Sequence, residues 1–301
     1  MGGQAALRWD CDLDLSIIHA TCVVASRGQT VEPRAESVFS EVVQSANQIL
    51  EEEGITPSEF WEQFRAAALA TGAQIESLDG LFALLGQSFT IGSLCQENLA
   101  SILGNAKGDL LSMRPPYGDQ LHLRYGPLRA RWDTCGVGLL RMISTRLWGT
   151  EQIPESYWPD AISLVMVQPT RGGDGGIAAE AGRVWMEAVL TDVDPEIPEV
   201  LRLAWLVSSI PLQRSMDHGT LDASKRDVLN LALVPLILEV GREFDLIKTT
   251  DLPVEKTLGL WQPHPTHHAA ALVEWWSEQG REELIGQSKA ESLANRLSQI
   301  G

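Results

Sequence analysis

Arginine is concentrated in one short part of an otherwise acidic chain. The segment 114–146 carries six arginines against two aspartates, a local charge of +4, whereas all 301 residues together carry −17. Its basic side chains alternate with apolar ones on both sides of Gly126-Pro127. Because alternate residues of a strand share a face, the alternation predicts a β-hairpin over 121–132 with one basic face. The four side chains of that face are His122, Arg124, Arg129 and Arg131.

The predicted basic face allows two interpretations. Arginine binds phosphates and carboxylates through paired hydrogen bonds, so the face could hold an anionic ligand or an acidic protein segment. Alternatively, the same arginines pair with acidic helices of this chain and join two lobes.

A second cluster consists of histidines. Three of the six histidines, His264, His267 and His268, lie within five residues. Imidazole is a ligand of zinc, and His267 could share a helix face with Glu274. The segment has neither a His-Glu-x-x-His motif nor a nearby cysteine, and Thr266 can serve as a helix N-cap. We therefore expect a proline-framed loop here, and no metal or other cofactor.

A third pattern is the C-x5-R spacing of Cys135 and Arg141, which is followed by Trp158-Pro159-Asp160. In these two motifs, over less than a tenth of its length, the chain resembles protein tyrosine phosphatases. The resemblance implies Cys135 as nucleophile, Arg141 as phosphate clamp and Asp160 as general acid. The two motifs stand in the reverse of the family's order, and Thr134 occupies the family's histidine position. We therefore expect a helix that Thr134 caps, with Leu139 and Leu140 in its core in place of a phosphate-binding loop.

A fourth candidate is the glycine-rich stretch 171–176. Backbone amides before a helix can bind anions, but the stretch matches neither G-x-x-x-x-G-K-[ST] nor G-x-G-x-x-G. It is predicted to be a flexible linker.

The elements that must position these residues are mostly helical. Apolar residues recur at helical spacing and are bounded by capping residues. Residues 161–167 read as a strand, 104–120 as a connection, and 12–25 as either strand or helix. Helices are predicted after Thr56, Ser77, Thr90 (ending at Gly104) and Thr134, and at about 34–53, 177–191, 197–210, 222–245, 253–262, 267–279 and 282–299. The predicted fold class is mainly α, with two helical lobes flanking a small β-hairpin-containing segment. The chain is expected to form one compact unit, 1–301, with lobes at about 34–104, 114–170 and 177–301.

Composition restricts the function class. A net charge of −17 argues against nucleic-acid binding by the whole molecule. No apolar run is long enough for a membrane span, and aspartates interrupt the N-terminus where a signal peptide would need an apolar core. The four cysteines are far apart in the sequence, which favours free thiols in the cytoplasm.

The sequence therefore predicts a non-enzymatic protein-interaction, adaptor or regulatory module of the cytoplasm, with a protein partner and without a nucleic-acid or membrane partner. The acidic helices at 34–53 and 274–299 could face partners that carry lysine and arginine. The alternative is an enzyme that acts on an anionic small substrate at the arginine-rich segment 114–146.

Overall fold

The computed structural model describes residues 7–26, 30, 33–72, 74–75, 77–113, 117–149, 158–217, 226–261 and 269–280. The protein is 67% helical, and the described residues form ten α-helices and one four-stranded mixed sheet. The prediction of a mainly helical protein is therefore confirmed. The β-structure, however, lies elsewhere in the sequence than predicted.

The sheet is assembled from segments that are far apart in the sequence. Its order is β1 (Leu7–Cys11), β2 (Ile162–Val167), β4 (Arg183–Glu187) and β3 (Gly175–Ala178). β1, β2 and β4 run parallel, and β3 runs antiparallel to β4. The central strand β2 is apolar except for Ser163, as expected for a strand that is covered on both faces. The strand predicted at 161–167 is confirmed.

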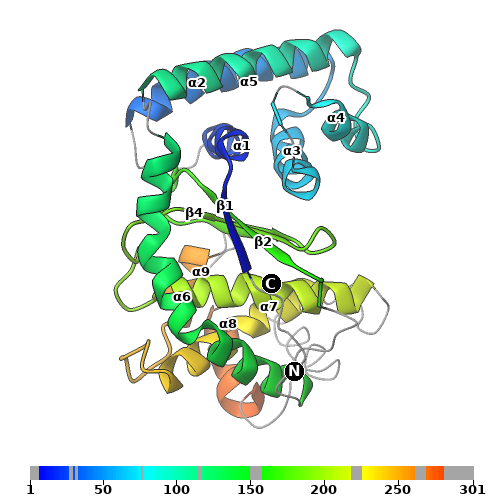
Figure 1. The fold of residues 1–301 in the computed structure, drawn as a ribbon. Helices are drawn as coiled ribbons and strands as arrows, with labels where there is room; N and C mark the ends of the chain where they lie inside the picture. The colour runs from blue at the N-terminus through cyan, green and yellow to red at the C-terminus, as the bar shows by residue number, and fades with distance from the viewer. Residues whose placement is uncertain are drawn as a thin grey trace.

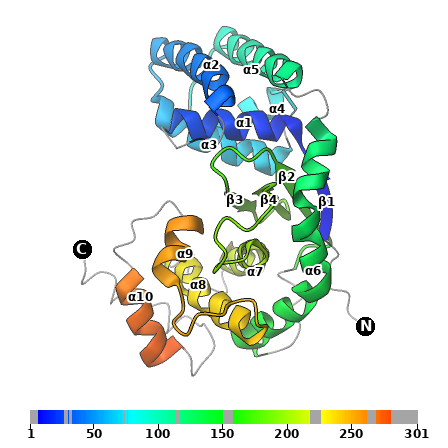
Figure 2. The same ribbon diagram turned by 90° about the vertical axis from the view of Figure 1, so that its left-hand side faces the viewer.

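Helices cover both faces of this sheet (Figures 1 and 2). α1 (Leu13–Ala25) and α3 (Pro57–Thr71) pack on one face, and α7 (Glu199–Asp217) packs on the other. α2 (Pro33–Glu52) and α5 (Ser93–Met113) form a further layer over α1, and α4 (Asp79–Leu85) packs beside α3. α3 begins after Thr56 as predicted, and Gly72, in the left-handed conformation, ends it.

The C-terminal helices pack on the side of α7 that faces away from the sheet (Figure 2). They are α8 (Arg226–Glu243), α9 (Val254–Trp261) and α10 (Ala269–Trp275), followed by a π-helical turn, Trp276–Gly280. α8 is apolar and buried over most of its length, so it forms the centre of this layer.

The hairpin predicted at 121–132 is wrong, because α6 (Tyr117–Trp148) is one continuous helix along the side of the molecule (Figure 1). The buried side chains Leu121, Tyr125, Leu128 and Trp132 are spaced by four, three and four residues, which is the helical period. Leu123 alternates with Leu121 and Tyr125 in the sequence, yet it is 74% exposed. Pro127 lies inside the helix, where it removes a main-chain hydrogen bond without ending the helix.

Three further predictions need correction. The stretch 171–176, predicted as a linker, and 177–191, predicted as a helix, contain the antiparallel strands β3 and β4. Gly104 does not end its helix, because α5 continues to Met113 through much of the predicted connection 104–120. Residues 12–25, left open as strand or helix, form α1, and Asp12 caps its start. The helix predicted at 282–299 lies outside the described residues.

Candidate functional site

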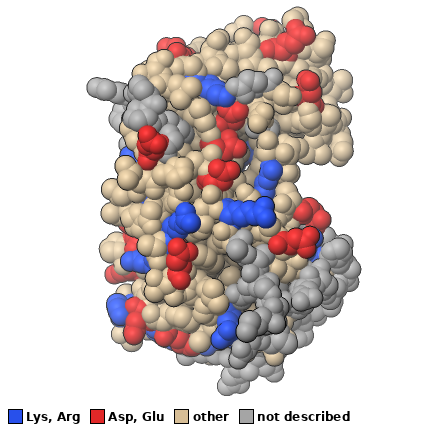
Figure 3. Space-filling model, viewed as in Figure 1, with Lys and Arg blue, Asp and Glu red and all other residues tan. Residues whose placement is uncertain are grey.

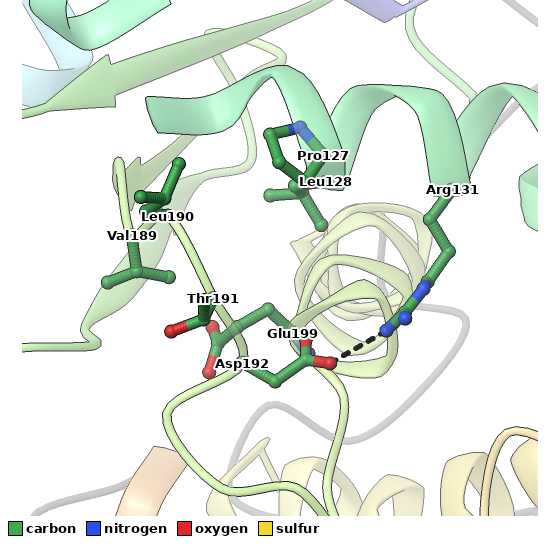
Figure 4. A pocket seen from close by; sticks show the side chains of 8 residues that line it. All are labelled: Pro127, Leu128, Arg131, Val189, Leu190, Thr191, Asp192 and Glu199. Atoms are coloured by element: carbon green, nitrogen blue, oxygen red, sulfur yellow. Dashed lines mark hydrogen bonds and ion pairs between the residues drawn. The ribbon is translucent and has the colours of Figure 1, made fainter. Parts of the chain in front are cut away.

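A pocket of about 250 Å³ opens where α6 passes the connection between β4 and α7 (Figure 4). Its lining combines apolar, basic and acidic side chains from three consecutive parts of the fold. α6 contributes Pro127, Leu128 and Arg131, the connection contributes Val189, Leu190, Thr191 and Asp192, and α7 contributes Glu199.

Local sequence explains why these residues meet. Pro127, Leu128 and Arg131 lie on one face of α6 because residues three and four apart are neighbours on a helix. Asp192 accepts a hydrogen bond from the Glu199 amide at 2.8 Å, and an acidic side chain is favourable at the start of a helix. The connection is thereby tied to the first residue of α7, directly opposite α6.

The polar side chains of the pocket differ in how fully they are partnered. Arg131 Nη1 lies 2.7 Å from Asp192 Oδ2, and the two side chains are 44% and 27% exposed. Glu199 is only 3% exposed. Its Oε1 lies 3.4 Å from Arg202 Nη2, whereas Oε2 has no hydrogen-bond partner among the described residues.

The surroundings of Glu199 disfavour its charged form. Burial raises the pKa of this carboxyl most strongly, and the negative charges of Asp192 and Glu187 raise it further. Arg202 and a backbone hydrogen bond from Val193 lower the pKa without cancelling these effects. Glu199 is therefore a buried carboxyl that takes up a proton more readily than a solvated one.

The outer rim of the pocket is apolar. Leu190 is 55% exposed, and Val193, just beyond the pocket, is 39% exposed. The volume lies below the 300–1,000 Å³ typical of sites for drug-sized ligands. It suits one side chain or one small group.

The structure separates the four predicted binding residues. A helix places His122 and Arg129 on one face and Arg124 and Arg131 on the opposite one, so no single basic face forms. His122 Nδ1 is 3.7 Å from Cys11 Sγ, and Arg129 lies 4.0 Å from Asp133 on the same helix. Of the four, Arg131 alone lines the pocket.

Arg131 is paired with a carboxylate of the same chain, as the second interpretation holds, and it also lines a pocket. Arg146 pairs with Glu243 and so joins α6 to α8.

The residues of the phosphatase-like motif lie in a different setting from that which the resemblance implies. Cys135 and Arg141 are both in the interior of α6, so the segment between them is helix and not a phosphate-binding loop. Cys135 Sγ donates to the Arg131 carbonyl at 3.2 Å, and burial raises the pKa of the thiol. Asp160 lies in the bend before β2. A thiol with a raised pKa is a poor nucleophile.

Sequence reasoning missed a buried pair at the carboxyl ends of the parallel strands. His19 Nε2, on α1, lies 2.7 Å from Glu187 Oε1, at the end of β4, and both side chains are almost fully buried. The same carboxylate accepts the amides of Thr170, Arg171 and Gly173 at 2.6–2.8 Å. Burial would raise the pKa of Glu187, but His19 and these amides lower it to about 2.

The role of this pair is to hold the chain that follows β2. The adjacent cavity, which Ser16, Gln168 and Thr170 help to line, has a volume of about 10 Å³, room for one water molecule at most. Neither residue carries a spacing signal in the sequence, because they meet only after 168 residues of chain.

Three further findings bear on the function. His264, His267 and His268 lie outside the described residues, and within those residues no group of three or more His, Cys, Asp or Glu side chains could hold a metal ion. No helix in the described part of the chain has the length and apolarity to cross a membrane. Protein-family models, curated proteins and solved structures all give no match to the chain. The function is therefore argued from the pocket.

Proposed function

We propose that the protein is a non-enzymatic protein-interaction module, an adaptor or regulator, which binds a partner protein at the pocket between α6 and the β4–α7 connection. The observation that carries this proposal is the exposed apolar rim, Leu190 and Val193, beside a cavity sized for a single side chain. Protein interfaces typically anchor in this way, with one side chain filling a pocket and apolar contacts excluding water around it.

Charge supports a basic partner segment. The pocket is lined by two carboxyl groups and one guanidinium, and the whole chain carries −17. Acidic side chains are spread over the face shown in Figure 3, whereas most basic ones lie over its middle and lower parts. Complementary charge of this kind steers association and selects partners.

The same observations weigh against an enzyme that acts on an anionic substrate here. An anion at Arg131 would have to displace Asp192 at 2.7 Å and would then face Glu199. Both carboxyl groups would repel it.

The compartment and the lobe arrangement belong to the same proposal. All four cysteines are free thiols, which fits a reducing cytoplasm. We propose that two helical lobes, one at 34–104 and one that begins at α7, are held by the sheet and α6, and that this frame keeps the pocket open.

A matched pair of surface variants tests the proposal. Leu190→Lys places a positive charge on the pocket rim, and Leu94→Lys makes the same change at a 67%-exposed position on α5. Binding is measured to immobilised decapeptides that have either a central Leu-Lys-Leu or a central Leu-Glu-Leu. We expect the unaltered protein and Leu94→Lys to retain the lysine peptides, and Leu190→Lys to lose them.

Two results would contradict the proposal. One is equal peptide binding by Leu190→Lys and Leu94→Lys. The other is turnover of p-nitrophenyl phosphate that disappears in Arg131→Gln, which would establish the enzyme instead.

A further inference from the structure

We infer that Glu199 is the residue of this pocket that binds the ligand directly, and that its ligand is a cationic N–H donor on an alkyl stem, an alkylammonium or alkylguanidinium group. This inference rests on the proposed function and specifies the chemistry of the group that enters the pocket.

The two carboxyl groups of the pocket differ in how many of their oxygens are paired. Asp192 uses both carboxylate oxygens, Oδ1 for the Glu199 amide and Oδ2 for Arg131. Glu199 uses Oε1 in the contact with Arg202 and leaves Oε2 without a partner among the described residues. In Figure 4 the dashed line joins Arg131 to Asp192, and none reaches Glu199.

The unpaired oxygen of Glu199 is a site for a hydrogen-bond donor. Folded proteins rarely leave a buried carboxylate oxygen without a donor. Glu199 is 3% exposed and lines the pocket, so the pocket is the side from which an outside donor can approach this carboxyl. Charged donors form the strongest hydrogen bonds to carboxylates.

Four charged groups surround the Glu199 carboxyl. Asp192 faces it from the connection, Glu187 from the end of β4, Arg202 from the next turn of α7, and Arg131 lies across the pocket on α6. Arg131 is already bound to Asp192. Arg202 Nη2 is shared between Glu199 Oε1 and the Leu260 carbonyl, whereas Arg202 Nε and Nη1 have no hydrogen-bond partner among the described residues. A cation entering the pocket therefore meets one carboxyl oxygen that no resident guanidinium satisfies.

The walls of the pocket favour a ligand with an apolar stem. Leu128, Val189 and Leu190 form apolar walls along the way to Glu199. Lysine and arginine side chains have an apolar stem and a charged end, so they match walls of this kind with a carboxyl beyond them. The raised pKa of Glu199 adds a signature, because the bound cation takes the place of a proton on this carboxyl. Binding should therefore weaken as the pH is lowered and this carboxyl takes up a proton.

The experiment uses two small probes on the full chain, n-butylammonium and the neutral n-butanol, followed by NMR of the Leu190 and Val189 methyl groups. We expect saturable shifts with n-butylammonium at millimolar concentration and at least tenfold weaker binding of n-butanol. Glu199→Gln should weaken n-butylammonium binding at least tenfold. Glu180→Gln, a matched change at an exposed position in the turn after β3, should leave it unchanged.

The outcomes separate this inference from the proposed function. Equal affinity for the two probes overturns it, as does Glu199→Gln binding n-butylammonium like the unaltered protein. The probe comparison needs no variant, so it decides the question even if Glu199→Gln does not fold. If peptides still bind in a Leu190-dependent manner while n-butylammonium does not bind, the interaction function stands and the role of Glu199 falls.

Discussion

Replacing Glu187 by glutamine should destabilise the protein strongly, although the change removes no volume. The carboxylate accepts His19 Nε2 and three backbone amides, those of Thr170, Arg171 and Gly173, at 2.6–2.8 Å. A glutamine has one acceptor oxygen, and its amide group would point donor against donor at one of these N–H groups. At least one buried donor would then lose its partner.

The magnitude follows from two independent routes. Leaving a buried donor without its partner costs about 1–3 kcal/mol, and more where one of the two groups is charged. The pKa of Glu187 is lowered from 4.5 to about 2, and 1.36 kcal/mol per unit converts this shift to about 3 kcal/mol of stability. We therefore expect Glu187→Gln to lose about 3 kcal/mol at pH 7, measured by urea denaturation, while Glu180→Gln in the exposed turn loses almost nothing.

The pH dependence gives a sharper test. Because the pKa of Glu187 is lowered on folding, its stabilisation is present above the pKa of an unfolded glutamate, about 4.3, and is lost as the pH falls toward 2. The difference in stability between the unaltered protein and Glu187→Gln should therefore shrink below about pH 4.5. A loss under about 1 kcal/mol at pH 7, or a difference that stays constant from pH 5 to pH 3, would refute the assigned role.

Three smaller perturbations have defined outcomes. Arg131→Gln breaks the pair with Asp192, but both side chains are partly exposed, so urea denaturation should show a loss of at most about 1 kcal/mol. Gly241→Ala places a methyl group 2.6 Å from Leu201 Cδ1 in the buried contact between α8 and α7, and overpacking there should cost about 1–3 kcal/mol in the same assay. Burial raises the pKa of Cys22 to about 12, so iodoacetamide at pH 8 should modify this thiol only after unfolding, as peptide mass analysis would show.

The sequence predicts elements well where the pattern is long and bounded. α2 lies within a residue of its predicted start and end, because a full amphipathic face is bounded by Pro33 and Gly54. α6 was predicted as a hairpin because the alternation over 121–132 is short, and Gly126-Pro127 resembles a turn. Extending the window to Leu139 and Ile143 shows the helical period that packing against β1, β2 and α7 selects.

A local sequence pattern cannot predict the pairing of the strands or the residues that meet in the pocket. β1 pairs in register with β2, for example Leu7 with Ile162, and a five-residue strand whose partner lies so far along the chain has no local signal. Arg131 was predicted to bind, but no local pattern links it to its partner Asp192, 61 residues further along the chain. Glu199 acquires its raised pKa from burial and from the charges of Asp192 and Glu187, which the fold brings close to it. Residue type and charge can be read from sequence, whereas desolvation and non-local pairing cannot.

The His19–Glu187 pair and the pocket at Glu199 are joined by the loop that contains Gly173. Glu187 binds the Gly173 amide, and Gly173 has a φ of +134°, a conformation that favours glycine. A side-chain carbon at Gly173 would lie 2.5 Å from Val193 Cγ2 and 3.1 Å from Arg202 Nη1. The loop that Glu187 holds is thus packed against the pocket rim and against the guanidinium that contacts Glu199. Loosening that loop must therefore change the surroundings of Glu199 as well as the stability of the sheet, and so a ligand that orders Glu199 should in turn stabilise the loop against unfolding.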